Sequence, residues 1–294
     1  MISAFFNSFS KFLGFLLALL FFVILLVFFS IFLSNSSNNF SYYKGNVNSS
    51  KKIAVINLSG PIISEPINLN IMNSFEAITP LQIKNYLNEL NNENISGMII
   101  SVNSAGGSVS ATQEIYSLLR DFKNKKRIPI YFHTDNILAS GAYWLAIIGE
   151  KIFANYGAII GSIGVKGPDW IYYNSPTSIS TGLFGSTVVS PNGIKVFSNT
   201  AGINKDIFNP FRAPSKKEVN NLQEMVDSIY EDFVQEVSRS RKLEKEFITQ
   251  EIGAMIFHSK KATKNFLIDG EKNIDQVLDF MIKKLKIDDV LIIQ

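Results

Sequence analysis

The sequence contains no cysteine, and this absence excludes three kinds of chemistry. Without thiols the chain can form no disulfide bond, no thiolate nucleophile and no cysteine-ligated metal site. Histidine is also scarce, because His133 and His258 are the only two among 294 residues. The pattern His-Glu-x-x-His is missing, and two histidines are too few for the zinc site of a metalloprotease. We therefore expect no metal and no cofactor.

The chain also lacks a large excess of charge of either sign. Its 28 lysine and arginine residues nearly balance 25 aspartate and glutamate residues, which leaves a formal net charge of +3. So small a charge predicts no nucleic-acid partner. The length suits one domain of ordinary size together with a membrane anchor.

Near the N-terminus, the apolar run from Phe12 to Leu33 carries no charge. A helix over these residues would span roughly 33 Å, close to the thickness of a hydrocarbon core of about 30 Å. A cleaved signal peptide is the alternative, but the apolar run is longer than usual and Ser34-Asn35-Ser36-Ser37 is a poor cleavage site. We predict an uncleaved transmembrane helix at 12–33 after a tail at 1–11. Lysines flank the helix on both sides, so their count does not decide its orientation.

The remainder of the chain divides into a linker and one domain. Residues 34–51 are rich in serine and asparagine, which predicts a flexible linker. From residue 52 onward, apolar strand patterns at 52–58, 98–102 and 128–132 alternate with amphipathic helix patterns. This alternation predicts an α/β domain over 52–294. Its longest helix begins at the capping box Ser215-x-x-Glu218, and the wide apolar side of that helix suits either the core or a subunit contact.

The junction at Ser140 is the first candidate for chemistry. A small-residue turn, Ala-Ser-Gly, separates the apolar strand at 128–132 from an apolar helix that follows. A serine on the first turn of a helix lies near unpaired backbone N–H groups, which favour a developing alkoxide or oxyanion. Ser140 is therefore our candidate nucleophile, and an ordinary helix cap is the alternative.

The second candidate is the pair Gly106-Gly107, in the segment Asn-Ser-Ala-Gly-Gly-Ser that follows a strand. Paired glycines let backbone N–H groups approach a ligand closely. The segment lacks the lysine of a phosphate-binding loop and the spacing of a dinucleotide fingerprint, so an oxyanion hole is the more specific interpretation. An ordinary strand-to-helix turn is the alternative. Two further segments, 161–165 and 204–212, carry little information alone.

In their order along the chain, the segments Asn-Ser-x-Gly-Gly-Ser-Val, Ala-Ser-Gly-x-Tyr, Gly-Ser-Ile-Gly-Val and Lys-Asp followed by Pro-x-Arg resemble the signal peptide peptidase A (protease IV) family. The similarity extends over residues 52–279. It implies a membrane-bound serine protease with a Ser–Lys dyad, on a Clp protease/crotonase-like fold of repeated ββα units. It implies the nucleophile at Ser140, the general base at Lys205, a supporting serine at Ser162 and an oxyanion-hole glycine in the pair Gly106-Gly107, with Gly106 preferred.

The resemblance also implies a substrate and a location. The substrates would be signal-peptide remnants or other apolar peptides. The chain would assemble into a homo-oligomeric ring or dome in which Ser140 and Lys205 of neighbouring subunits meet. The tail would lie in the cytosol, and the catalytic domain would lie on the outer side of a bacterial inner membrane.

The chain departs from the family pattern in two places. Ala105 stands where the family usually has proline, and the interval from Gly164 to Lys205 is long, so Lys195 is the alternative base. A lysine acts as a base only when it is largely neutral, which burial in an apolar pocket promotes. Around Lys205, such a pocket would come from Ile207, Phe208 and Phe211.

Three other interpretations stay open at this stage. His133, with Asp135 nearby, is the only credible member of a Ser-His-Asp triad, although a histidine hydrogen-bonded at a strand end is the simpler expectation. A crotonase-type acyl-CoA enzyme would share the oxyanion chemistry. A membrane scaffold with a degenerate site would keep the fold and hydrolyse nothing.

Overall fold

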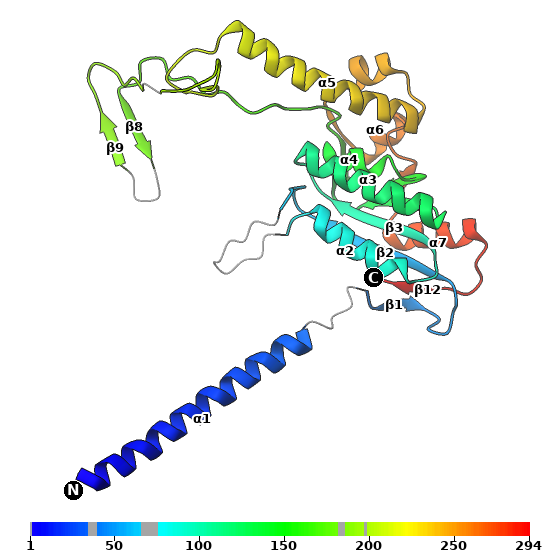
Figure 1. The fold of residues 1–294 in the computed structure, drawn as a ribbon. Helices are drawn as coiled ribbons and strands as arrows, with labels where there is room; N and C mark the ends of the chain where they lie inside the picture. Colours follow the sequence, from blue (N-terminus) through cyan, green and yellow to red (C-terminus); the bar gives the residue numbers. More distant parts are fainter. Residues whose placement is uncertain (1, 35–39, 66–75, 182–185, 197–198) are drawn as a thin grey trace.

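The computed structural model covers residues 1–294 and describes all of them except 1, 35–39, 66–75, 182–185 and 197–198. The first helix, α1 (Ile2–Ser34), stands apart from the rest of the chain (Figure 1). Its segment Ser8–Phe29 has a mean hydropathy of 3.2 and is not buried against the protein. The predicted N-terminal apolar helix is therefore confirmed, and it is long enough to cross a membrane.

A seven-stranded sheet forms the centre of the molecule, in the order β1-β12-β2-β3-β4-β6-β11. All neighbouring pairs are parallel except β1 with β12. The strands are β1 (Tyr42–Gly45), β2 (Lys52–Ser59), β3 (Ile95–Asn103), β4 (Ile130–Thr134), β6 (Lys151–Ala154), β11 (Gly270–Glu271) and β12 (Leu291–Ile293).

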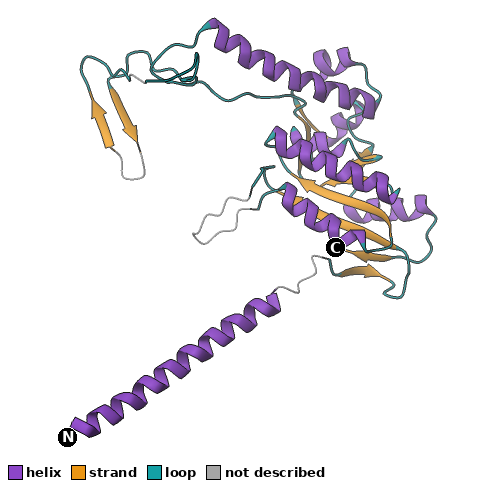
Figure 2. Ribbon diagram, in the orientation of Figure 1, coloured by secondary structure: helices purple, strands orange, loops and turns teal. Residues whose placement is uncertain are grey.

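Helices cover both faces of this sheet, as Figure 2 shows. Successive side chains of a strand point to opposite faces. On β2, Ala54 and Ile56 join the core under α2 (Pro80–Asn91) and α3 (Val109–Lys126), whereas Ile53 and Val55 join the core under α7 (Ile274–Leu285). Strands buried on both faces carry continuous apolar runs, which is the pattern that the sequence displayed. The predicted α/β class is confirmed.

The segment 34–51 differs from the expected flexible linker. Its residues 35–39 lie outside the described part of the chain. From Phe40 onward the segment belongs to the domain: Phe40 packs edge-to-face on Tyr86, with ring centroids 5.7 Å apart, and β1 pairs with β12. The aromatic residues at 40, 42 and 43 and the open edge of β12 account for this strand within a serine- and asparagine-rich stretch.

A smaller three-stranded sheet lies beside the large one, in the order β10-β7-β5. Its strands are β5 (Ile137–Ala139), β7 (Ile159–Gly161) and β10 (Ile256–His258), and β5 leads into the short helix α4 (Gly141–Ala146). Every residue of α4 is buried. On α4, Trp144 stacks on Phe233 of α5 (Lys216–Arg241) with ring centroids 4.2 Å apart. The π-helix η1 (Phe247–Ile252) and the helix α6 (Ser259–Lys264) complete this side.

Between β7 and α5 the chain leaves the sheets and forms an extended arm, residues 165–215 (Figure 1). The arm carries a hairpin of β8 (Ser178–Thr181) and β9 (Ser186–Val189) and then returns to the first turn of α5. The predicted capping box of Ser215 and Glu218 is present. Only the C-terminal half of α5 packs on the body, through Phe233, Val234 and Val237.

Candidate active site

Three strand ends converge at Ser140. In the small sheet, Ala139 of β5 lies opposite Gly161 of β7, and the Ser140 N–H donates to the Gly161 carbonyl at 2.9 Å. On the other side, the Ala139 N–H donates to the Ser104 carbonyl at 3.1 Å, in the loop that follows β3. These ladders bring the candidate residues Ser140, Ser162 and Gly106 to one place.

Ser140 has a backbone conformation that side-chain-bearing residues rarely adopt, with φ +53° and ψ −126°. Such a conformation costs on the order of 1–3 kcal/mol and persists where the surrounding structure imposes it, often at functional sites. The Ser140 side chain makes no capping hydrogen bond to α4. Ser140 thus occupies the N-cap position of α4, but its hydroxyl group does not cap the helix.

Gly106 lies directly against the candidate nucleophile. A Cβ atom at this position would come within 2.8 Å of the Ser140 Cβ and 2.7 Å of the Gly141 nitrogen, and the φ of Gly106 is +96°. Glycine is thus required both by the backbone conformation and by the close approach of the two loops.

The backbone N–H groups around Ser140 differ in their hydrogen bonding. The Gly106 N–H donates to the Ser104 hydroxyl at 3.1 Å. Within the described part of the chain, the N–H groups of Gly107 and Gly141 have no acceptor. These two groups are the unpaired donors of the residues that follow Gly106 and Ser140, and the sequence interpretation had not included Gly141. Its position immediately after the candidate nucleophile is the signal that identifies it.

Ser162 mirrors Ser140 on the adjacent strand. It follows β7 as Ser140 follows β5, and its φ is +52°. Its N–H donates to the Met255 carbonyl at 2.8 Å, and its hydroxyl group has no partner among the residues that the structure describes. Two serine hydroxyls thus end two neighbouring parallel strands.

Lys205, by contrast, does not reach this site within one chain. It is exposed in a turn over residues 202–209, which we call the lysine turn, near the first turn of α5. From Lys216 at that end of α5 to Phe233, where the helix meets the body, the distance is roughly 25 Å at about 1.5 Å per residue. The alternative base, Lys195, is also exposed on the arm, beside the hairpin.

The lysine turn carries an ion cluster that sequence reasoning had not identified. Arg212 donates to both carboxylate oxygens of Asp206 at 2.8 Å, and to those of Glu218 at 3.0 and 2.6 Å. The Arg212 guanidinium lowers the pKa of the Asp206 and Glu218 carboxyl groups to about 2. The Lys-Asp and Pro-x-Arg spacing contained these residues, but nothing in it indicated that they bind one another.

His133 is fully buried, and both of its ring nitrogens make hydrogen bonds within the body. Its Nδ1 accepts a hydrogen bond from the Ser101 hydroxyl at 3.3 Å, and its Nε2 donates to the Lys272 carbonyl at 3.1 Å. Burial lowers the pKa of His133 below its ordinary value, against the smaller opposing effect of Asp135. With both ring nitrogens so engaged, the simpler expectation for His133 fits the structure.

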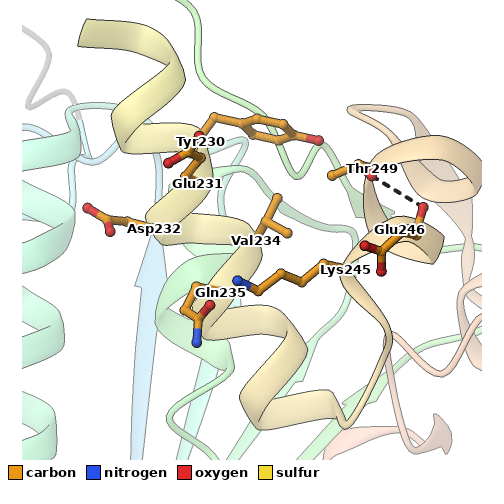
Figure 3. A pocket seen from close by; sticks show the side chains of 8 residues that line it. All are labelled: Tyr230, Glu231, Asp232, Val234, Gln235, Lys245, Glu246 and Thr249. Atoms are coloured by element: carbon orange, nitrogen blue, oxygen red, sulfur yellow. Dashed lines mark hydrogen bonds between the residues drawn. The ribbon is translucent and has the colours of Figure 1, made fainter. Parts of the chain in front are cut away.

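A cavity of about 420 Å³ lies between α5 and η1, and Figure 3 shows Lys245 reaching into it toward α5. Three carboxylates share this cavity with that lysine, and none of its lining residues belongs to the candidate site. In the described ranges, no group of three or more histidine, aspartate and glutamate residues is arranged to hold a metal ion. The cavity is lined by Tyr230, Glu231, Asp232, Val234, Gln235, Lys245, Glu246 and Thr249.

Comparison with known proteins finds proteases among the similar chains. A protein of Enterococcus faecium named as a signal peptide peptidase SppA is 28% identical over 250 residues, which are 84% of this chain and 67% of that protein. A protein of Methanocaldococcus jannaschii named as a protease is 30% identical over 204 residues, 67% of this chain and 61% of that protein. The solved structure of a membrane-bound stomatin-specific protease, as a serine-to-alanine mutant, matches with a TM-score of 0.45 and 15% identity, over 79% of this chain and 84% of that one.

The family model described as peptidase family S49 matches residues 122–288, which is more than half of the chain. The match includes the candidate residues Ser140, Ser162 and Lys205. The protein belongs to peptidase family S49.

Proposed function

We propose that this protein is a membrane-anchored serine endopeptidase whose active site combines Ser140 of one subunit with Lys205 of its neighbour. The observation that carries the proposal is the contrast between the two residues. Ser140 lies among free N–H donors and beside Ser162, whereas Lys205 lies at the end of an arm that leads away from them. A lysine held at such a distance serves a site on another copy of the chain.

The chemistry is acyl transfer to a serine hydroxyl group. The neutral amine of Lys205 removes the proton from the Ser140 hydroxyl as the oxygen attacks a peptide carbonyl. The N–H groups of Gly107 and Gly141 bind the oxyanion that forms. The protonated lysine then gives its proton to the leaving amine, and the peptide bond breaks. Water, deprotonated in turn by the lysine, hydrolyses the acyl-enzyme.

Assembly also supplies the environment that the base requires. Lys205 is exposed to water in the single chain. When the lysine turn docks on the strand ends of a neighbouring subunit, the amine loses water, and desolvation lowers the pKa of an amine. The Ser162 hydroxyl, which follows the strand adjacent to Ser140, is suited to hold the lysine in place.

The arm carries the exposed apolar surface that such docking needs. Large exposed apolar groups of this kind mark interaction sites. A head-to-tail contact of one arm with the next body closes into a ring when the rotation allows. Among the described residues, the large exposed apolar side chains of the arm and of the first half of α5 are Ile171, Tyr172, Tyr173, Val189, Val196, Ile203, Phe208, Val219 and Met225.

The substrates are apolar peptides, with signal-peptide remnants as the class that the named relatives suggest. An enzyme anchored by α1 works next to a membrane, where such remnants remain after their precursors are cleaved. We place the catalytic domain on the outer side of a bacterial inner membrane, with residues 1–11 in the cytosol.

The test is complementation between two inactive variants of the full chain in detergent. Ser140→Ala and Lys205→Met should each abolish peptide hydrolysis, and Ser140→Ala should also abolish labelling by a fluorophosphonate. After the two variants are mixed and reassembled, about a quarter of the sites should be intact, because each site takes its serine and lysine from different subunits.

Two results would overturn the proposal. If Ser140→Ala kept its activity, Ser140 would not be the nucleophile. If the reassembled mixture stayed inactive while mixed wild-type subunits exchanged normally, the dyad would not be shared between subunits.

A further inference from the structure

The lysine turn is isolated from the hydrophobic core of the domain. Its residues 202–205 are all exposed, and Ile203 is 91% exposed. Neither a strand ladder nor a buried side chain fixes the position of Lys205. The local structure must therefore be held by the contacts that the arm makes with itself and with α5.

The strongest of these contacts converge on Arg212. Its Nε and Nη2 bind the two oxygens of the Asp206 carboxylate through parallel hydrogen bonds, and Nη2 also donates to the Asp206 backbone carbonyl at 3.4 Å. A planar guanidinium bound in this way fixes the orientation of its partner as well as its distance. Asp206 is the residue next to Lys205, so Arg212 fixes the backbone immediately beside the proposed base.

Arg212 is itself fixed to the start of α5. The Glu218 side chain is only 2% exposed, and it accepts hydrogen bonds from the Arg212 guanidinium, from the Ser215 N–H and from the Ser215 hydroxyl, the last two at 2.8 Å. The same carboxylate thus closes the capping box of α5 and binds the arginine. Through these bonds the lysine turn is joined to a 26-residue helix whose other end packs on the body.

Aromatic side chains of the arm also contact the cluster, and Trp170 comes from the segment that leads out to the hairpin. The Arg212 guanidinium lies over the Trp170 ring, 5.5 Å from its centroid, and Trp170 also packs on Phe208 with ring centroids 5.2 Å apart. The Trp170 indole N–H donates to the Asn209 carbonyl at 3.3 Å. The segments of the arm before and after the hairpin therefore contact each other at Arg212.

We propose that Arg212 is a positioning residue, which holds the lysine turn on the first turn of α5 so that Lys205 enters the neighbouring subunit in one orientation. This inference rests on the proposed function, since Arg212 would orient Lys205, the proposed general base. A base displaced by about 1 Å loses on the order of 100-fold in rate, even when the base itself is intact. The cluster thus acts on the rate of the chemical step through the geometry of the base.

The test measures kcat and KM for an apolar peptide with full-length Arg212→Met, Asp206→Asn and Glu218→Gln in detergent. The matched control is Lys166→Met, which removes the exposed ion pair of Lys166 with Asp169 in the same arm. We expect kcat to fall about 100-fold in Arg212→Met while KM and the oligomeric state stay close to wild type. The control should keep wild-type kcat.

Two further variants separate positioning from general stabilisation of the arm. Arg212→Lys should recover only part of the rate, because an ammonium group cannot make the paired bonds of a guanidinium. The double variant Asp206→Asn/Arg212→Met should lose no more activity than the worse single variant, because both changes break one interaction. Each readout compares rates at a temperature where all variants remain assembled.

Several results would overturn the inference while leaving the proposed function intact. Wild-type kcat in Arg212→Met, additive losses in the double variant, or a loss that appears only as dissociation of the oligomer would each do so. If Arg212→Met does not fold, the kcat of Glu218→Gln tests the inference instead, because this variant keeps the shape of the cluster. Full activity in Lys205→Met would instead contradict the proposed function itself.

Discussion

The two halves of the proposed active site are built in different ways. Ser140 follows a strand, its neighbours Ala139 and Ala142 are buried, and its N–H is part of a ladder. Lys205 lies in an exposed turn that side-chain hydrogen bonds hold to the end of a helix. Packing of the core therefore fixes the position of the serine, whereas contacts within the arm and with α5 fix the position of the lysine.

This difference predicts how each half of the site responds to substitutions. Changes near Ser140 must distort a packed interior, where nearly every added atom meets another. Changes in the arm leave the body folded and act only when a second copy is present. Four experiments break or sharpen the comparison, from the largest expected effect to the smallest.

Replacing the lysine should cost the most. Lys205→Met is expected to reduce turnover by several orders of magnitude, and Lys205→Arg should fail to restore it, because a guanidinium stays protonated and cannot accept the serine proton. Turnover of an apolar peptide, measured across pH, is the readout. Substantial activity in Lys205→Arg would reject the base assignment, and an inactive Lys195→Met would transfer it to Lys195.

On the serine side, the sharpest single change is Gly106→Ala. The added methyl group would lie 2.8 Å from the Ser140 Cβ, so the loop must shift and spoil the geometry of the oxyanion site. We expect kcat/KM to fall on the order of 100-fold. Gly157→Ala is the control, because Gly157 also has a positive φ, +85°, but an added Cβ meets nothing within 4 Å. Equal losses in both variants would show that backbone strain alone is responsible.

His133 should affect the stability of the body and leave the reaction unchanged. Its pKa is lowered by burial, so below about 6.5 the unfolded chain binds more protons than the folded one, and stability falls as the pH decreases. Above that pH the contribution is fully present. Denaturant unfolding of His133→Gln should lack this part of the pH dependence, and peptide turnover should stay near wild type. A large loss of turnover in a folded variant would revive a Ser-His-Asp triad.

The smallest effect is expected from removing the N-terminal helix. A chain that begins at Phe40 should keep wild-type kcat, because α1 contributes no group to the site. A chain that begins at Ser50 lacks β1, and it should be less stable, because it loses the hydrogen bonds of residues 41–49, each worth about 1 kcal/mol. Denaturant midpoints and kcat of both chains give the comparison. An inactive chain from Phe40 would mean that α1 contributes to the site.

The body of the site could be predicted from the sequence to a large extent. The strand at 98–102 before Gly106 and the apolar run before Ser140 were predicted from their patterns, and the carboxyl ends of neighbouring parallel strands meet. Ser162 was assigned by the resemblance alone, and the short strand β5 directly before Ser140 was not predicted. What the sequence did not indicate is the hydrogen-bonding state of these loops. It could not reveal that the Gly106 N–H is already bound by Ser104, which leaves the donors of Gly107 and Gly141 free.

The arm was much less predictable, for a physical reason. A local pattern indicates a turn or a helix start, but it does not show whether a segment folds back on its own domain. The same limit applied to β1, whose pairing partner β12 lies at the opposite end of the sequence. In both cases a pattern in the neighbouring residues does not show which other part of the chain the segment contacts.

The place of β12 between β1 and β2 bears on how the protein is made. Synthesis proceeds from the N-terminus, at roughly 5–20 residues each second, so α1 and β1 leave the ribosome long before Leu291 to Ile293 exist. Until those three residues emerge, β1 has no neighbour and the large sheet has a gap beside β2. The addition of β12 thus completes the large sheet. A nascent chain that reaches the membrane through α1 must wait until Leu291 to Ile293 have been synthesised before β1 can join that sheet.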